Sequence, residues 1–151
     1  MTITHIPAHL FWLFQDRDIL KQGECYANAG AAVIFSSFEN EISEWLVTNS
    51  WKISYTIGVL SPPGFDSVPH AWLKAEQGTG RNYWWDPTLQ KNSRIWGMRS
   101  REFSYKEVAT FNDQELKEWF KKAYEGSEFS PHGVPVQPCR FPIVDLKGNV
   151  S

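Results

Sequence analysis

The stretch VPHAWLKAEQGTGRNYWWDPTLQ, from Val68 to Gln90, decides the fold of this 151-residue chain. Two segments rich in aromatic and other apolar residues, HAWLKAE and NYWWDPT, flank the sequence QGTGR, whose glycines are typical of a tight turn. We therefore predict two antiparallel strands joined as a hairpin. If the hairpin is centred near Gly78, the numbers of paired residues sum to about 156, which places His70 opposite Asp86. A histidine and an aspartate are then expected side by side.

The segments before the hairpin predict helices followed by another strand. Apolar residues at helical spacing predict a helix over residues 8–20 and a second, buried helix from Cys25 to residue 40. Residues 42–50 fit either a short helix or a strand. Residues 51–60, WKISYTIGVL, alternate and are rich in β-branched and aromatic residues, which predicts a strand.

After the hairpin, RIWGM and REFSY are plausible further strands, and NDQELKEWFKKAYEG predicts the clearest helix of the chain. Asn112 and Glu115 are spaced as a capping box at its start, and Gly126 stops it. The order of elements predicts a single α+β domain over residues 1–151, with helices packed on one antiparallel sheet. The proline-containing tail, about residues 127–151, is expected to run extended over the surface and to end loosely.

Composition argues against several classes of partner. The chain carries 15 Lys and Arg against 17 Asp and Glu, a net charge of −2, so no basic excess favours nucleic acid. No apolar stretch approaches the roughly 20 residues that span a bilayer, so we expect no membrane contact. The N-terminus lacks the pattern of a secretory signal, which favours a cytoplasmic location. The sequence carries no signal for an oligomeric state.

The two cysteines, Cys25 and Cys139, are not expected to form a structural disulfide, because no export signal is visible. They have no CxxC spacing, and only four histidines accompany them, which argues against a zinc site. Nothing in the chain marks a pocket for a cofactor. We therefore expect neither a metal nor a cofactor.

Cys25 has the setting of a nucleophile. Only the thiolate form of cysteine is nucleophilic, and the N-terminus of a helix favours that anion through its dipole and its unpaired N–H groups. Cys25 follows the glycine-containing break KQGE and opens an alanine-rich segment. The same N–H groups can receive the oxyanion of a tetrahedral intermediate.

His70 and Asp86 can complete a catalytic relay with Cys25. A histidine takes the thiol proton and later gives it to the leaving group, and a carboxylate fixes the tautomer of the imidazole and stabilises its charged form. Pro87 biases Asp86 to an extended backbone, which helps to aim the carboxylate. A lone cysteine, histidine or aspartate is more often structural, so the prediction depends on the three residues occurring together.

The motifs GECYANA, HAW and WWDPT, in that order, resemble the core of the transglutaminase-like branch of the papain-like cysteine hydrolases. The resemblance covers about residues 22–90. It implies a papain-like fold with the nucleophile at a helix N-terminus packed on an antiparallel sheet. It also implies Cys25 as nucleophile, His70 as general base and acid, and Asp86 as the orienting carboxylate.

The resemblance implies attack on an amide carbonyl of a protein or peptide and formation of a thioester. Members of the family include proteases, protein deamidases, acyl-transferring crosslinkers and peptide-glycan amidases, and the compact size leans slightly toward a deamidase or a narrow-specificity acyl hydrolase. A non-catalytic binding or inhibitory module on the same scaffold is the alternative, and an acetyl-transferring relative is a third possibility.

Four further residues have weaker claims to a role in the site. The family often places an oxyanion-hole glutamine before the nucleophile, and Gln22 is the nearest candidate here, with Gln15 further upstream. Trp72 and Trp85 are candidates for a substrate-binding wall, although core tryptophans are the more common case. Strand alternation sends Trp84 and Trp85 to opposite faces of the sheet.

Overall fold

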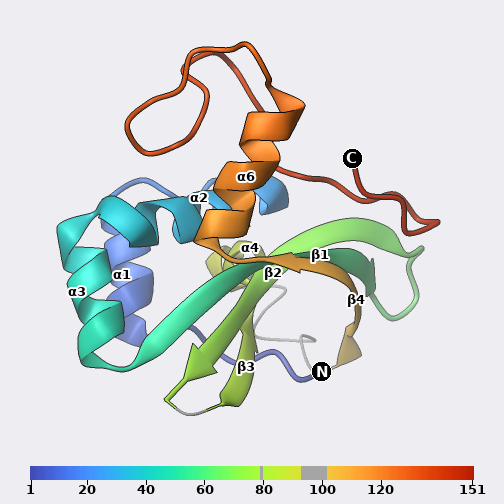
Figure 1. Cartoon of the computed structure of the whole chain (residues 1–151). Coiled ribbons are helices and arrows are strands. Elements are labelled where there is room, and N and C mark those ends of the chain that lie inside the picture. The colour runs from blue at the N-terminus through green and yellow to red at the C-terminus, as the bar shows by residue number, and fades with distance from the viewer. Residues whose placement is uncertain (79, 93–101) are drawn as a thin grey trace.

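The computed structural model describes residues 1–78, 80–92 and 102–151, and it has an α+β fold (Figure 1). The elements, in chain order, are α1 (Ala8–Asp16), α2 (Cys25–Phe38), α3 (Asn40–Thr48), β1 (Trp51–Ser61), β2 (Val68–Gln77), β3 (Arg81–Trp85), α4 (Pro87–Lys91), β4 (Ser104–Phe111) and α6 (Asp113–Ala123). No helix within these described ranges is long and apolar enough to cross a membrane.

The four strands form one antiparallel sheet in the order β3-β2-β1-β4. The predicted hairpin is present as β2 and β3, but its register differs from the prediction. Leu73 pairs with Trp85, so the numbers of paired residues sum to 158. The turn is centred one residue later than predicted, between Gly78 and Gly80, which both have positive φ (59° and 110°). Asp86 therefore lies beyond the last residue pair instead of opposite His70.

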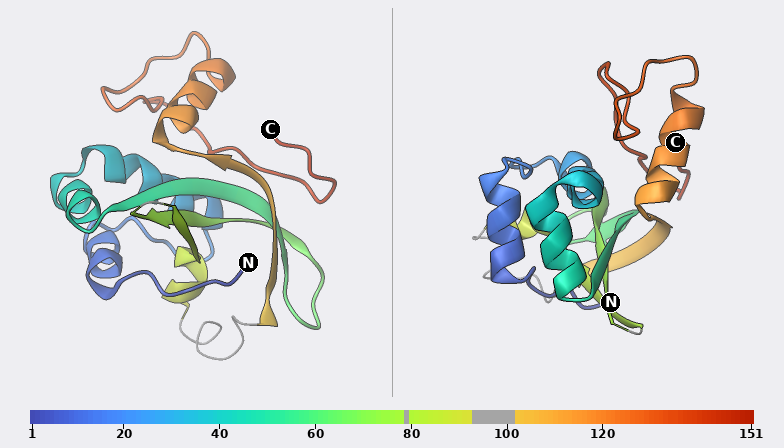
Figure 2. Two further views of the ribbon diagram at one scale, coloured as in Figure 1. Left: turned by 60° about the horizontal axis from the view of Figure 1, so that its bottom comes forward. Right: turned by 60° about the vertical axis from the view of Figure 1, so that its left-hand side comes forward.

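Helices α1, α2 and α3 lie together against one face of the sheet (Figures 1 and 2). The main core lies between these layers, and the buried side chains that build it include Leu10, Leu13, Val33, Ile42, Tyr55, Ile57, Leu73 and Trp85. A smaller cluster, made of Leu60, Trp72, Leu89 and Tyr105, packs separately. Because side chains alternate along a strand, neighbouring residues of the hairpin contribute to different clusters.

A β-bulge interrupts the pairing of β1 with β4. Ile57 pairs with Ala109, but Gly58 pairs with Glu107, so Val108 is the extra residue of β4. Gly58 is required at this point, because a Cβ atom there would lie 1.9 Å from the carbonyl oxygen of Lys106. A bulge shifts the residues on one side of it to the other face of the sheet, relative to the residues on its other side.

The predicted helices are present, but they end at other residues than predicted. The first helix stops at Asp16, and Asp18 has a positive φ of 55°. The predicted helix from Cys25 ends at Phe38, and the side chain of Glu39 then caps α3 by accepting from Ile42 N. The ambiguous segment 42–50 is thus mostly helix.

Downstream of the hairpin the predictions are partly confirmed. Helix α6 begins with the predicted capping box of Asn112 and Glu115. The strand predicted in REFSY begins only at Ser104, and RIWGM lies outside the described residues. The motif DPT is not strand but the start of the short helix α4.

The tail lies outside the helices and strands and folds back on itself, with antiparallel bridges between Phe129 and Pro135 and between Val144 and Val150, and its end is not loose. The hydroxyl of Tyr55 donates to the carbonyl oxygen of Pro142 at 2.5 Å, and Val144 is buried. The ring of Phe141 fills the space beside Gly30 of α2, where a Cβ atom would lie 2.4 Å from that ring. Ile143 and the terminal Ser151 exchange two main-chain hydrogen bonds, both 3.0 Å long. The tail is therefore held against the body of the fold.

Candidate active site

Cys25 is the first residue of α2 and is partly buried. The N-cap residue, Glu24, makes no side-chain hydrogen bond to the helix, and the first intrahelical bond runs from Asn28 N to Glu24 O. The N–H groups of residues 25–27 thus have no cap from Glu24. Such unpaired donors at the positive end of the helix dipole stabilise an anion placed beside them.

His70 contacts both other members of the predicted relay. Its Nε2 atom lies 2.7 Å from Oδ2 of Asp86, and the pair is almost completely buried. The imidazole also hydrogen-bonds the side chain of Cys25. Because Nε2 is occupied by Asp86, Nδ1 is the nitrogen available to the thiol. The structure thus brings the three predicted residues together.

Asp86 occupies the junction between β3 and α4. Its backbone is extended, as Pro87 favours, and Oδ1 accepts the N–H of Leu89 at 3.1 Å, which caps α4. Oδ2 accepts from His70 and also from the hydroxyl of Tyr105 at 2.7 Å. Although the register differs from the prediction, the carboxylate reaches His70 from just beyond the end of β3.

The charge of Asp86 decides the protonation of His70. Burial, the largest single influence, lowers the pKa of His70, but the charge and hydrogen bond of Asp86, assisted by Cys25, outweigh it and raise the pKa to about 10. The imidazolium form is therefore favoured at neutral pH. An imidazolium next to a thiol is the arrangement that stabilises a thiolate.

Asn28, one turn after Cys25 on α2, fixes the loop that leads into the nucleophile. Its side chain is fully buried, accepts from Lys21 N at 2.6 Å and donates to Lys21 O at 2.7 Å. It also lies 2.9 Å from the hydroxyl of Thr88 in α4. One side chain thus ties the loop before Cys25 to the helix that Asp86 caps.

The tail lies close to the nucleophile. Burial above all, and then the neighbouring Cys25, raise the pKa of Tyr26, and the hydroxyl of Tyr26 accepts the N–H of Val144. Cys25 also acts electrostatically on Tyr55, whose hydroxyl holds Pro142. The segment from Pro142 to Val144 is therefore part of the surroundings of the site.

The remaining predictions concern two tryptophans as a substrate-binding wall and two glutamines as oxyanion donors. Trp72 and Trp85 are 0% and 1% exposed, so the expectation that they line a substrate cleft is wrong for this structure, since both rings fill cores. Trp84 and Trp85 do enter different clusters. Gln22 is exposed on the turn before Cys25, and Gln15 is exposed on α1. No hydrogen bond within the described part of the chain fixes either amide, so the N–H groups of α2 are better placed as oxyanion donors.

Sequence reasoning missed Tyr105, Asn28 and Thr88. Asn28 offered a signal, since a polar residue inside an alanine-rich apolar helix has to find a hydrogen-bonding partner. Thr88 belongs to the motif DPT, but the sequence does not indicate which residue it contacts. Tyr105 offered no signal, because its position depends on the bulge at Val108.

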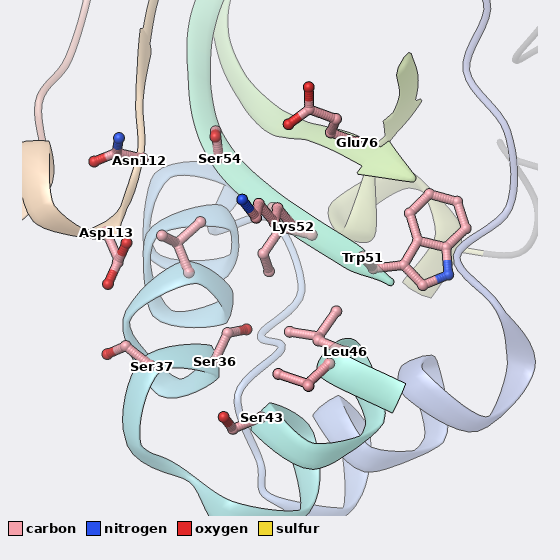
Figure 3. Close-up of a pocket in the computed structure, with 13 residues that line it drawn as sticks. Ser36, Ser37, Ser43, Leu46, Trp51, Lys52, Ser54, Glu76, Asn112 and Asp113 are labelled. Atoms are coloured by element: carbon pink, nitrogen blue, oxygen red, sulfur yellow. The ribbon is translucent and has the colours of Figure 1, made fainter. Parts of the chain in front are cut away.

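A separate groove of about 540 Å³ lies near the other end of α2 (Figure 3). Side chains from α2, α3, β1 and the start of α6 surround it, among them Ser36, Ser37, Lys52 and Asp113. Cys25, His70 and Asp86 are not among its lining residues. Among the described residues, no group of three or more His, Cys, Asp or Glu side chains is placed to hold a metal ion.

Comparison of the chain with protein-family models finds no match, and neither the curated proteins nor the solved structures include a significant one. The functional interpretation therefore depends on the geometry of the site and on the motifs themselves.

Proposed function

We propose that the chain is a cysteine-dependent amide hydrolase or acyltransferase with a transglutaminase-like, papain-like core. The observation that carries the proposal is that one buried imidazole contacts both Cys25 and Asp86. The motifs GECYANA, HAW and WWDPT support it, because all three supply a residue to this contact.

The residues suffice for both halves of an acyl transfer. The Cys25 thiolate attacks the amide carbonyl carbon, and the new oxyanion is received by the N–H groups at the start of α2. As the tetrahedral intermediate collapses, the C–N bond breaks and the His70 imidazolium protonates the departing nitrogen. Water, or an acceptor amine, then attacks the thioester while His70 takes its proton. Cys25 leaves as the thiolate, and Asp86 keeps the imidazole oriented throughout.

The leaving group separates a deamidase from a protease. In a deamidase it is ammonia from a side-chain carboxamide, and in a protease it is the amine of a main chain. The experiment incubates the protein with a glutamine- and asparagine-containing protein substrate and analyses it by mass spectrometry. Conversion of amides to acids identifies a deamidase, chain cleavage identifies a protease, and an isopeptide product identifies an acyltransferase.

The Cys25→Ala variant is the test of the proposal, and Cys139→Ala is the matched control. Cys139 is exposed on the tail and is not part of the relay. We expect the first variant to lose all turnover with an unchanged fold and the second to keep it. Turnover that survives in Cys25→Ala overturns the proposal.

The second candidate function is a binding or inhibitory module that uses the same scaffold without turnover. The observation that favours it is the exposed side chain of Gln22, which no hydrogen bond among the described residues fixes beside the nucleophile. Tight, stoichiometric binding of a protein by both wild type and Cys25→Ala, with no chemical change in that protein, would support this alternative.

A further inference from the structure

Tyr105 shares one oxygen of Asp86 with His70. Its hydroxyl donates to Oδ2 at 2.7 Å, the same atom that lies 2.7 Å from Nε2 of the imidazole. The Tyr105 residue is only 8% exposed, and its ring packs edge-on against Trp72 with ring centroids 5.0 Å apart. The hydroxyl therefore has a fixed partner in a buried environment.

The bulge in β4 is what brings Tyr105 to this oxygen. Beyond Val108 the register pairs Leu60 with Tyr105. Leu60 lies on the same side of β1 as Gly58, and Gly58 is the partner of His70 in β2. If the register of Ile57 and Ala109 continued without a bulge, Lys106 would lie opposite Leu60, and Tyr105 would point to the other face. One inserted residue thus replaces a cation with a phenol beside the carboxylate.

We propose that Tyr105 is a positioning residue of the relay, which acts through Asp86 by taking up part of the negative charge of Oδ2. The catalytic role of Tyr105 rests on the proposed function. Its effect on the pair of Asp86 and His70 does not depend on that function. Burial above all, and then the adjacent carboxylate, raise the pKa of Tyr105. The hydroxyl consequently stays protonated and can only donate to Asp86.

Charge sharing, more than orientation, is the expected effect of the hydroxyl. Oδ1 is already fixed by the N–H of Leu89, so the carboxylate keeps its direction without Tyr105. The loss of one donor from Oδ2 concentrates charge on the oxygen that faces the imidazole, and more charge there stabilises the imidazolium further. Removal of the hydroxyl should therefore make His70 more basic.

Few other groups can produce such an effect on His70. Among the described residues, the titratable groups that act on it are Asp86, from the β3–α4 junction, and Cys25, from α2. On β1 its partner is Gly58, which has no side chain. On β4 the charged neighbours of Tyr105 are Lys106 and Glu107, and both are exposed.

The experiment is an NMR titration of the His70 imidazole in wild type and in Tyr105→Phe. The substitution removes one oxygen atom and keeps the ring that packs on Trp72. We expect the midpoint of the His70 titration to move up by about half a pH unit, the equivalent of part of one hydrogen bond. Tyr83→Phe is the matched control, because the Tyr83 hydroxyl contacts Arg81 and lies outside the site, and it should cause no shift.

A second variant distinguishes charge sharing from a general change of structure. In the background of Asp86→Asn there is no carboxylate charge to share, so Tyr105→Phe should have no further effect on His70. An unchanged or lowered midpoint in the single variant overturns the inference, as does an equal shift in the Asp86→Asn background.

If the protein proves to have no turnover while the shift is observed, the proposed function fails and the inference about the pair stands. If turnover is present and the shift is absent, only the inference fails.

Discussion

At the residue scale, the site is built around one carboxylate whose two oxygens have three donors. Asp86 receives the N–H of Leu89 on Oδ1, and His70 and Tyr105 on Oδ2. A buried carboxylate without such partners would be protonated, since burial strongly disfavours the charged form. The three donors offset that cost for Asp86, and its carboxylate in turn raises the pKa of His70.

The raised pKa of His70 predicts how stability depends on pH. The folded value, about 10, lies above the ordinary value of 6.5, so the folded state binds this proton more tightly than the unfolded state. The resulting stabilisation is fully present below pH 6.5 and is lost as the pH rises through 10. Urea denaturation between pH 6 and 10.5 should therefore show a fall in the free energy of unfolding that is smaller in His70→Gln. Identical pH profiles for wild type and His70→Gln would contradict a raised pKa of His70 in the folded state.

The substitution Asp86→Asn should impair turnover more than it impairs the fold. An amide has no charge with which to stabilise the imidazolium, so we expect kcat to fall by roughly 100-fold or more. Circular dichroism should show the native secondary structure, because an asparagine can still cap α4. A kcat within about threefold of wild type would remove Asp86 from the relay.

At the element scale, the site depends on the loop that delivers Cys25 to α2. The buried side chain of Asn28 satisfies both main-chain groups of Lys21 and contacts Thr88. Three elements of the site are thus coupled by one amide: the loop, α2 and α4. The hydrogen bonds lost by its removal are partly buried, so the loss of these partners carries a cost.

We therefore predict that Asn28→Ala lowers the free energy of unfolding by about 1–3 kcal/mol and also slows alkylation of Cys25. The control is Asn112→Ala, which removes the cap of α6 and should cost about 1 kcal/mol without changing that rate. Urea denaturation and timed alkylation measure the two effects. Equal alkylation rates in the two variants would show that Asn28 is structural only.

Local patterns explain which elements the sequence could predict. The hairpin, α2 and α6 have strong local signals: alternation, a glycine-containing turn, an alanine-rich apolar segment and a capping box. The register of the hairpin and the bulge at Val108 have none. The register depends on where the turn is centred, and the bulge depends on the fit of Gly58 against Lys106 and Trp72 across strands. Tyr105 could not be predicted for the same reason.

At the scale of the whole molecule, the tail braces the helical layer near the candidate site. Phe141 packs beside Gly30 in the middle of α2, and Val144 donates to Tyr26 at its start. The sequence predicted an extended tail from its prolines. It could not predict the attachment, because that depends on a gap left by a glycine more than 100 residues earlier in the chain.

The substitution Phe141→Ala should lower the free energy of unfolding by about 1–3 kcal/mol, since the ring is half-buried and fills a space that the backbone cannot close. Val136→Ala, at a position that is 58% exposed on the same tail, should change it by about 0.5 kcal/mol or less. Thermal and urea unfolding compare the two. A Phe141→Ala protein as stable as wild type would mean that the tail is detached in solution.

Activation of the Cys25 sulfur by the fold can be measured by competitive alkylation of the two cysteines within one molecule. The protein is treated briefly with iodoacetamide at pH 6.5, and the labelling of Cys25 and Cys139 is measured by peptide mass spectrometry. Partial burial of its sulfur raises the pKa of Cys139, although the residue is exposed at the surface, and this makes it a slow internal reference. If the relay activates Cys25, this cysteine reacts at least about tenfold faster than Cys139 and loses this advantage in His70→Gln. Labelling of Cys25 that is no faster than that of Cys139, or that is unchanged in His70→Gln, would contradict this activation.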